Sequence, residues 1–85
     1  MSFMNYYVYI LYSTVFDKFY IGQSNDINDR LRRHNAGSEK ATSPYRPWVM
    51  MWNTVKPSRS AAMELEKKLK NLSKERIREF ISKYS

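Results

Sequence analysis

The chain has 85 residues, a net charge of +7 and no cysteine, so we expect one domain, residues 1–85, with a modest core and no second regulatory domain. The lack of cysteine excludes a disulfide scaffold, a zinc ribbon and a thiol nucleophile, and the single histidine excludes a multi-histidine metal site. No apolar run approaches the roughly 20 residues of a membrane-spanning helix and no secretory leader is evident, so we expect a cytoplasmic protein without a membrane partner.

The first predicted elements are two tyrosine-rich strands. Residues 5–13 read NYYVYILYS, and these are strong strand formers on both faces. A turn at TVFDK leads into a second strand at residues 19–22, which we expect Gly22 to end, giving an antiparallel hairpin. If Tyr9 lies opposite or diagonal to Tyr20, both hydroxyls share one face within reach of each other. Tyr6 and Tyr12 fall on the other face and are expected to pack.

A helix is predicted next, within QSNDINDRLRRHNAG. Ser24 or Asn25 is the expected N-cap, and Gly37 the expected stop. The segment 37–47 then carries two prolines and small polar residues, which is typical of a loop that is mobile or functional.

The apolar stripe of this helix contains an arginine. Ile27, Leu31 and His34 should face the sheet, and Arg30 falls inside the same stripe. Because Arg30 and His34 are four residues apart, they can act on one bound group.

A third strand and two helices complete the chain. Residues 48–55 are apolar on both faces, a helix should start at Pro57 or Ser58 and run to about residue 72, and Ser73 should cap a final helix with an apolar stripe. The predicted order is β-β-α-β-α-α. This order indicates an α+β fold in which a small three-stranded antiparallel sheet is flanked by helices.

The first of these two helices also carries a charge at the edge of its apolar stripe. Glu66 is placed to look toward the sheet, whereas Glu64 lies on the outer side. Each such residue has an ordinary explanation: Arg30 and Glu66 could form a structural ion pair, and the tyrosines and His34 could be satisfied core residues. The convergence on one sheet face of five such side chains favours a site, formed by Tyr9, Tyr20, Arg30, His34 and Glu66.

These residue types match the needs of phosphodiester hydrolysis. A single carboxylate suits Mg²⁺, which keeps several waters and uses substrate phosphate for its other ligands. Arginine offers a planar fork for phosphate oxygens, and a tyrosine whose pKa is lowered by a nearby metal and arginine can activate water.

Several motifs in order resemble the GIY-YIG nuclease domain, especially its compact single-domain bacterial members. They are Tyr7-Val8-Tyr9, then Tyr20-Ile21-Gly22, then DINDRLRRH at residues 26–34 with its Arg-x-x-x-His spacing, and the later Glu66. The resemblance covers residues 6–72 and implies a small antiparallel sheet with flanking helices and an endonuclease that uses Mg²⁺ or Mn²⁺, in a setting such as DNA repair.

The resemblance also implies a role for each site residue. Tyr9 and Tyr20 line the site and one of them activates water, Arg30 faces the phosphate, His34 supports proton transfer, and Glu66 is the sole carboxylate ligand of one metal ion. Gly22 is expected to let substrate approach the backbone. Tyr7 departs from the family, which has glycine there, and Asn71 is the candidate for a further carboxamide in the site.

The partner expected from the charge is nucleic acid, DNA more than RNA. Residues 56–85 hold nine Lys and Arg against four Glu, and residues 1–55 hold six against four acidic residues. Two alternatives stay open: a nucleic-acid-binding or partner-recruiting module without turnover, and a structural domain. The candidate nucleic-acid contacts are Arg32, Arg33, Lys40, Tyr45, Arg46, Lys67 and Lys70.

Overall fold

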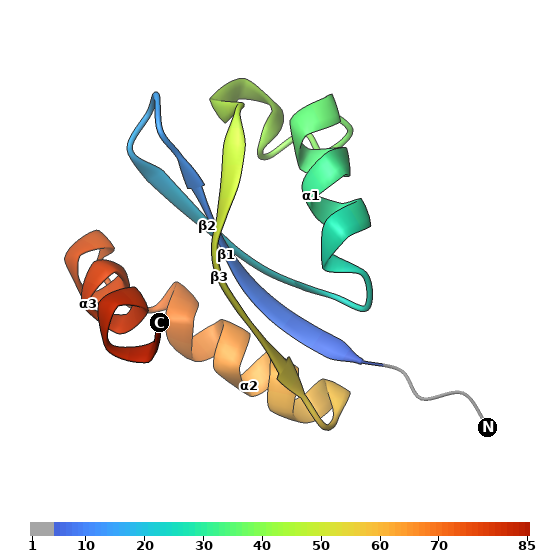
Figure 1. Cartoon of the computed structure of the whole chain (residues 1–85), viewed down its shortest axis with the longest axis vertical. Helices are drawn as coiled ribbons and strands as arrows, with labels where there is room; N and C mark the ends of the chain where they lie inside the picture. The colour runs from blue at the N-terminus through green and yellow to red at the C-terminus, as the bar shows by residue number, and fades with distance from the viewer. Residues whose placement is uncertain (1–4) are drawn as a thin grey trace.

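The computed structural model describes residues 5–85 and confirms the predicted α+β fold. Its three-stranded antiparallel sheet has the order β2-β1-β3, with β1 at the centre. Helix α1 covers one face, and α2 and α3 cover the other (Figure 1). The elements are β1 (Tyr6–Ser13), β2 (Lys18–Ser24), α1 (Ile27–Ala36), the short 3-10 helix η1 (Ser43–Tyr45), β3 (Trp48–Lys56), α2 (Arg59–Lys70) and α3 (Lys74–Tyr84).

Each face of the sheet has its own apolar core, because the side chains of β1 alternate between the two faces. Tyr9 and Leu11 of β1 point toward α1, whereas Val8 and Ile10 point toward α2 and α3. The predicted alternation of β1 is therefore confirmed. The α1 core also contains Trp48, Tyr20, Ile27, Leu31, Tyr45 and Met50, and the other core contains Ile21, Ala62, Leu69, Ile77 and Ile81 with Phe19, Trp52 and Leu65 at its border.

Strand β2 runs two residues beyond its predicted end, which moves the start of α1. Gly22 lies inside the strand, opposite Tyr9, and Ser24 still pairs with β1. Ser24 therefore cannot be the N-cap, and neither is Asn25. The N-cap is Asp26, whose backbone is extended and whose Oδ1 accepts a hydrogen bond from the Asp29 amide.

Strand β3 contains a bulge that changes which way its side chains face. Ile10 pairs with Trp52 and the next residue, Leu11, pairs with Met50, so Met51 has no partner on β1. As a result Trp48 packs in the α1 core, and Trp52 borders the core under α2 and α3.

Helix α3 begins after its predicted cap, Ser73, and α2 begins at Arg59, one residue beyond the predicted start, with Ser58 as its N-cap. Ser58 accepts a hydrogen bond from the Ala61 amide, and Ser73 accepts one from the Arg76 amide. The hairpin turn joins α3 through Asp17, which receives hydrogen bonds from Tyr12, Lys74 and Arg78. Within residues 5–85, none of the helices has the length and apolarity that crossing a bilayer requires.

Candidate active site

Tyr9 lies at the centre of the sheet, where the absence of a side chain on β2 makes room for it. It pairs with Gly22 on one side and Asn53 on the other, and it is 2% exposed. Tyr20 pairs with Leu11, so the two tyrosines are diagonal neighbours on the α1 face, as expected. The space over Gly22, expected to admit substrate, is instead filled by the Tyr9 ring, since a Cβ there would lie 2.5 Å from Tyr9 Oη.

His34 links Tyr9 to the loop that follows α1. Its Nε2 lies 3.0 Å from Tyr9 Oη, and its Nδ1 lies 2.8 Å from Thr42 Oγ1. His34 and Thr42 are each 1% exposed, and the Tyr20 ring packs edge-on against the imidazole at 5.0 Å between centroids. The predicted proximity of the two tyrosines to His34 is therefore present in the structure.

The hydrogen bonds around Thr42 select one form of the imidazole. The Thr42 hydroxyl has a single hydrogen, which it donates to the Glu39 carbonyl oxygen at 3.4 Å. We assign Nδ1–H of a neutral His34 as the donor to Thr42 Oγ1, which leaves Nε2 to accept the Tyr9 hydroxyl proton. This assignment satisfies every member of the buried chain from Tyr9 to Glu39.

The loop at residues 37–47 is anchored to β3. Trp48 Nε1 donates to the Thr42 carbonyl at 2.9 Å, and Asn35 exchanges two hydrogen bonds with the Trp48 backbone. The loop therefore functions as a support that fixes Thr42 under His34.

Burial shifts the pKa values of Tyr9 and His34 in the directions that favour their neutral forms. Desolvation is the main cause that raises the pKa of Tyr9 above its ordinary value, followed by the negative charges of Tyr20, Glu39 and Glu66, while Arg30 acts against them. Desolvation also lowers the pKa of His34. In the protein alone the pKa of Tyr9 is therefore raised, the lowering expected beside a bound metal ion stays a prediction, and Tyr9 and His34 are both neutral at pH 7.

Arg30 lies near this pair but does not bond to Glu66. Its Nη1 is 3.4 Å from Glu39 Oε1, and the two side chains are 33% and 35% exposed. The alternative of a buried Arg30–Glu66 ion pair is therefore wrong. The positive charge of Arg30 is felt at both members of the pair, since it acts to lower the pKa values of Tyr9 and His34.

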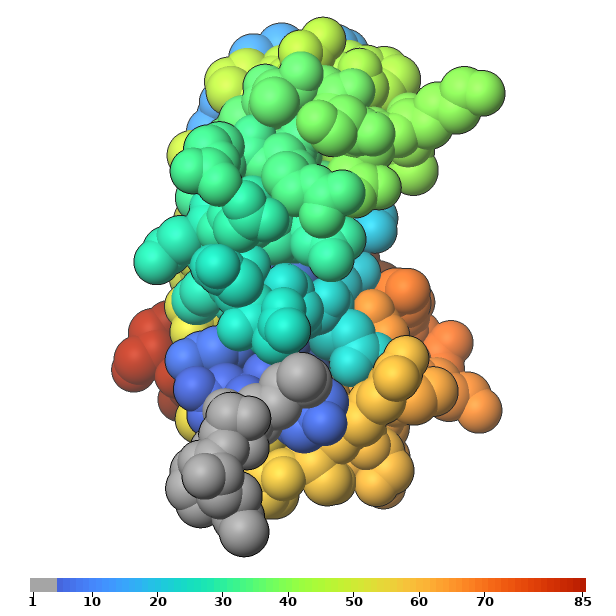
Figure 2. All heavy atoms as spheres, turned by 90° about the vertical axis from the view of Figure 1, so that its right-hand side faces the viewer, coloured from blue at the N-terminus to red at the C-terminus, as the bar shows by residue number. Residues whose placement is uncertain are grey.

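Glu66 comes from the opposite layer of the molecule. The stripe of α2 packs on the face of the sheet that carries Val8 and Ile10, so the expectation that all five site residues point at one face is wrong. Glu66 reaches the edge of the sheet instead, where its Oε1 accepts from Gln23 Nε2 of β2 at 3.1 Å. Figure 2 shows β2 and the start of α1, in cyan, against α2, in orange. The site therefore spans both layers across the β2 edge.

The surroundings of Glu66 suit a hard divalent cation. Its side chain is 19% exposed, with Oε2 lying 3.5 Å from Lys70 Nζ at the surface. Within residues 5–85 no three His, Cys, Asp or Glu side chains lie together as a group that could hold a metal ion. Mg²⁺ is commonly held by one or two carboxylates together with waters and substrate phosphate, so Glu66 suits such an ion as a single carboxylate ligand when the Lys70 ammonium moves away from Oε2.

Comparison with known protein families matches this chain to one family model. The family model described as the GIY-YIG catalytic domain matches residues 5–80. The chain belongs to the GIY-YIG family. GIY-YIG domains are generally nucleases, so this membership supports a nuclease.

An experimentally determined relative supports the same GIY-YIG fold. The chain is 31% identical over 80 residues to UPF0213 protein BH0048 of Halalkalibacterium halodurans, a match that covers 93% of this chain and 84% of that protein. The solution NMR structure of UPF0213 protein BH0048 from Bacillus halodurans aligns with a TM-score of 0.63 at 30% identity, covering 95% of this chain and 86% of that one.

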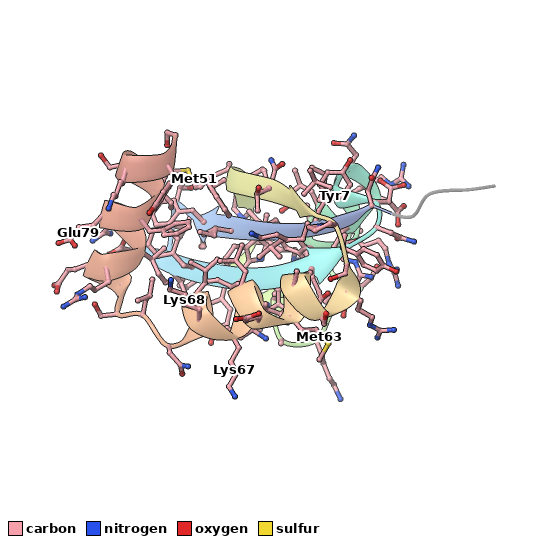
Figure 3. All side chains as sticks on the ribbon, turned by 90° about the horizontal axis from the view of Figure 1, so that it is seen from below. Tyr7, Met51, Met63, Lys67, Lys68 and Glu79 are labelled. Carbon is pink, nitrogen blue, oxygen red and sulfur yellow. The ribbon has the colours of Figure 1, made fainter. Side chains whose placement is uncertain are left out.

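Among the candidate nucleic-acid contacts of this GIY-YIG domain, Lys70 pairs with the site residue Glu66. Tyr45 packs against Phe16 and under the Lys18 ammonium, and the Arg46 guanidinium folds over Gly37. Lys67 projects from the outer side of α2 (Figure 3). Arg33 and Lys40 are exposed, and Arg32 pairs with Asp29, so the remaining contacts stay predictions.

Three site residues of this GIY-YIG domain were missed by sequence reasoning: Gln23, Glu39 and Thr42. Each acts through a partner distant in sequence or through an irregular loop, and only the small polar composition of residues 37–47 could have pointed to Thr42. Asn71, the candidate carboxamide, is the C-cap of α2. Tyr7, which replaces the family glycine, pairs with Ser24 and Val55, two residues from Tyr9 toward the start of β1 (Figure 3).

Proposed function

We propose that this GIY-YIG domain is a metal-dependent endonuclease that hydrolyses phosphodiester bonds of nucleic acid, with DNA preferred over RNA. The observation that carries the proposal is the buried hydrogen bond from Tyr9 Oη to His34 Nε2, beside the guanidinium of Arg30. A hydroxyl that donates to an imidazole can pass its proton on, which is what the activation of water requires.

The proton path follows from the tautomer of His34. The attacking water gives a proton to Tyr9 Oη while the Tyr9 proton moves to His34 Nε2, so no free phenolate forms despite the raised pKa of Tyr9. The water oxygen bonds to phosphorus, the bond from phosphorus to the leaving oxygen breaks, and the leaving oxygen takes up a proton from solvent. The proton gained by His34 then returns to Tyr9, which releases one to solvent. The imidazolium formed on His34 lies near the carboxylate of Glu39, whose charge favours the protonated ring. Tyr20, the more exposed tyrosine, orients the reacting groups beside His34.

Arg30 and Glu66 act on the phosphate from the two layers. The Arg30 fork supplies paired donors for the phosphate oxygens whose charge grows during attack, and Glu39 holds it in place. Glu66, with Gln23 beside it, would hold a divalent ion, which when bound supplies positive charge to the phosphate and the leaving oxygen.

The test is cleavage of a panel of linear, nicked, flap and branched DNA, with matched RNA, in Mg²⁺ or Mn²⁺ and with EDTA. The wild type should cut at least one substrate when Mg²⁺ or Mn²⁺ is present and none in EDTA, and Glu66→Ala should cut none in either condition. Glu64→Ala is the matched control, because it removes a carboxylate from the outer side of the same helix. Equal cleavage by wild type and Glu66→Ala would show contamination and end the proposal, and salt-sensitive binding without cleavage would favour a binding module.

A further inference from the structure

A basic groove lies along the free edge of β2, beside the residues placed in the reaction, and it shares only Tyr20 with them. It has a volume of about 350 Å³ and lies between β2 and the junction of α2 with α3. Lys18, Lys70 and Lys74 contribute its charge, and apolar side chains that include Phe19 and Leu72 complete the lining. No acidic residue lines it. A groove of this composition complements a polyanion that also carries apolar surface.

The three lysines are held at the surface by weak partners. Lys70 Nζ lies 3.5 Å from Glu66, Lys74 Nζ lies 3.0 Å from Asp17, and Lys18 Nζ lies over the Tyr45 ring at 4.0 Å. The Lys70, Lys74 and Asp17 side chains are about half-exposed, whereas that of Glu66 is 19% exposed. Surface pairs of this kind contribute little free energy and are easily exchanged for a phosphate. Asp17 also keeps Arg78 as a partner when Lys74 moves away.

The groove is continuous with the candidate active site. Tyr20 lines it and also packs on His34, and Lys70 lines it and pairs with Glu66. β2 is an edge strand, so the outward amides of the strand are available to phosphate oxygens. Beyond Glu66 the same edge continues into a second hollow of about 310 Å³, which includes Gln23 and Arg59.

We infer that the groove binds the sugar-phosphate backbone of the substrate strand on one side of the scissile bond, so that a single strand of nucleic acid runs along the free edge of β2. The inference rests on the proposed function and specifies the path of its substrate. Lys18 and Lys74, which sequence reasoning did not select, become phosphate contacts. The apolar lining contacts the sugars, and binding is independent of base sequence.

Binding without turnover tests the groove. Fluorescein-labelled single-stranded DNA is titrated in EDTA, over a salt series, against wild type and the double variant Lys18→Ala with Lys74→Ala. The matched control is Lys68→Ala with Lys83→Ala, which removes the same charge; Lys68 lies on the flank of α2 opposite Glu66 and Lys70. Melting curves show that each variant is folded.

The groove variant should lose about tenfold in affinity, and the slope of log K against log salt should fall by roughly 1.4, the value for two phosphate contacts on a single strand. The control variant should lose less than about threefold in affinity, as expected when only the overall electrostatic field of the protein changes. Equal losses in the two double variants would overturn the inference.

A small diester separates this inference from the proposed function. Bis(p-nitrophenyl) phosphate reaches the site residues without a chain that extends into the groove, so the groove variant should hydrolyse it at the wild-type rate in Mn²⁺. If the wild type cuts neither DNA nor this diester while the binding difference holds, the groove stands and the nuclease proposal fails. If the diester is cut and the two double variants bind DNA alike, the groove inference fails alone.

Discussion

The ring of Tyr9 crosses the backbone of Gly22 so closely that a Cβ at position 22 would lie 2.5 Å from Tyr9 Oη and 2.6 Å from Cζ. Gly22 is a strand residue that pairs with Tyr9, so its lack of a side chain serves the packing of the tyrosine. The second motif glycine and the first motif tyrosine are thus one structural unit.

Gly22→Ala should displace the Tyr9 hydroxyl from His34 and cost about 1–3 kcal/mol in unfolding free energy, as overpacking does. Nuclease activity should fall about a hundredfold or more, because the lost hydrogen bond carries the proton. Denaturant unfolding and cleavage assays measure the two effects. Wild-type activity in a folded Gly22→Ala protein would contradict the role given to the Tyr9–Gly22 contact.

Tyr9→Phe should keep the fold and lose about 10²–10⁴ in rate, the usual contribution of a proton-transfer group. It leaves His34 Nε2 without a donor, so unfolding free energy should fall by about 1–3 kcal/mol. Tyr12→Phe is the control, since it removes a hydroxyl from the other face of the same strand, where it binds Asp17. Equal activity losses in the two variants would point to a general effect on β1.

The tautomer of the only histidine can be observed directly. Nitrogen chemical shifts of His34 in a ¹⁵N-labelled protein should show Nδ1 protonated and Nε2 bare, because Thr42 accepts from Nδ1. Thr42→Val keeps the shape but removes the acceptor, so the Nε2–H form should gain population and cleavage should slow while the melting temperature changes by only a few degrees. An unchanged tautomer in Thr42→Val would remove Thr42 from the proton path.

Stability should depend on His34 below neutral pH. Folding lowers its pKa from an unfolded value near 6.5, so below that value the unfolded chain binds more protons than the folded one. Unfolding free energy should therefore fall as the pH drops from about 7 through 6.5 toward 5, and His34→Gln should flatten this part of the profile. The pKa of Asp17 is also lower in the folded protein, so its contribution to the unfolding free energy should be lost only as the pH falls below about 4. A His34 proton resonance that titrates above 6.5 would contradict the burial effect.

Arg30→Ala should lower activity by about 10²–10³, as the loss of one preorganised donor does. Its pair with Glu39 is partly exposed, so unfolding free energy should fall by no more than about 1 kcal/mol, measured by calorimetry. Arg30→Lys should recover little, since an ammonium lacks the planar fork. A destabilisation of several kcal/mol would instead assign Arg30 a structural role.

Local patterns in the sequence predicted most of the fold, because they have local physical causes. The alternation in β1, the Pro57-Ser58 start signal and the serine cap at position 73 each gave a correct element. The layer of Glu66 was not predictable in the same way. The stripe of α2 shows which side of the helix faces the sheet, but only chain topology decides which face of the sheet the helix covers.

The same limit applies to the partners of the site residues. Tyr9, Tyr20 and His34 were found by type and spacing, and the structure brings them together. Glu39 and Thr42 lie in a loop whose conformation depends on Trp48 and Asn35, contacts that no periodicity encodes.

The bulge at Met51 gives the site a dependence on a distant position. It rotates the start of β3 by one residue, which places the Trp48 indole where it can bind the Thr42 carbonyl. In an unbulged β3 of the same length, Trp48 would lie opposite Thr14 and face α3, leaving the loop without its anchor, whereas deletion of Met51 itself would keep Trp48 opposite Ser13. The chemistry assigned to Tyr9 and His34 is therefore tied to the way the ladder of another strand absorbs one unpaired residue, since only this bulge keeps Trp48 and Trp52 on opposite faces of the sheet.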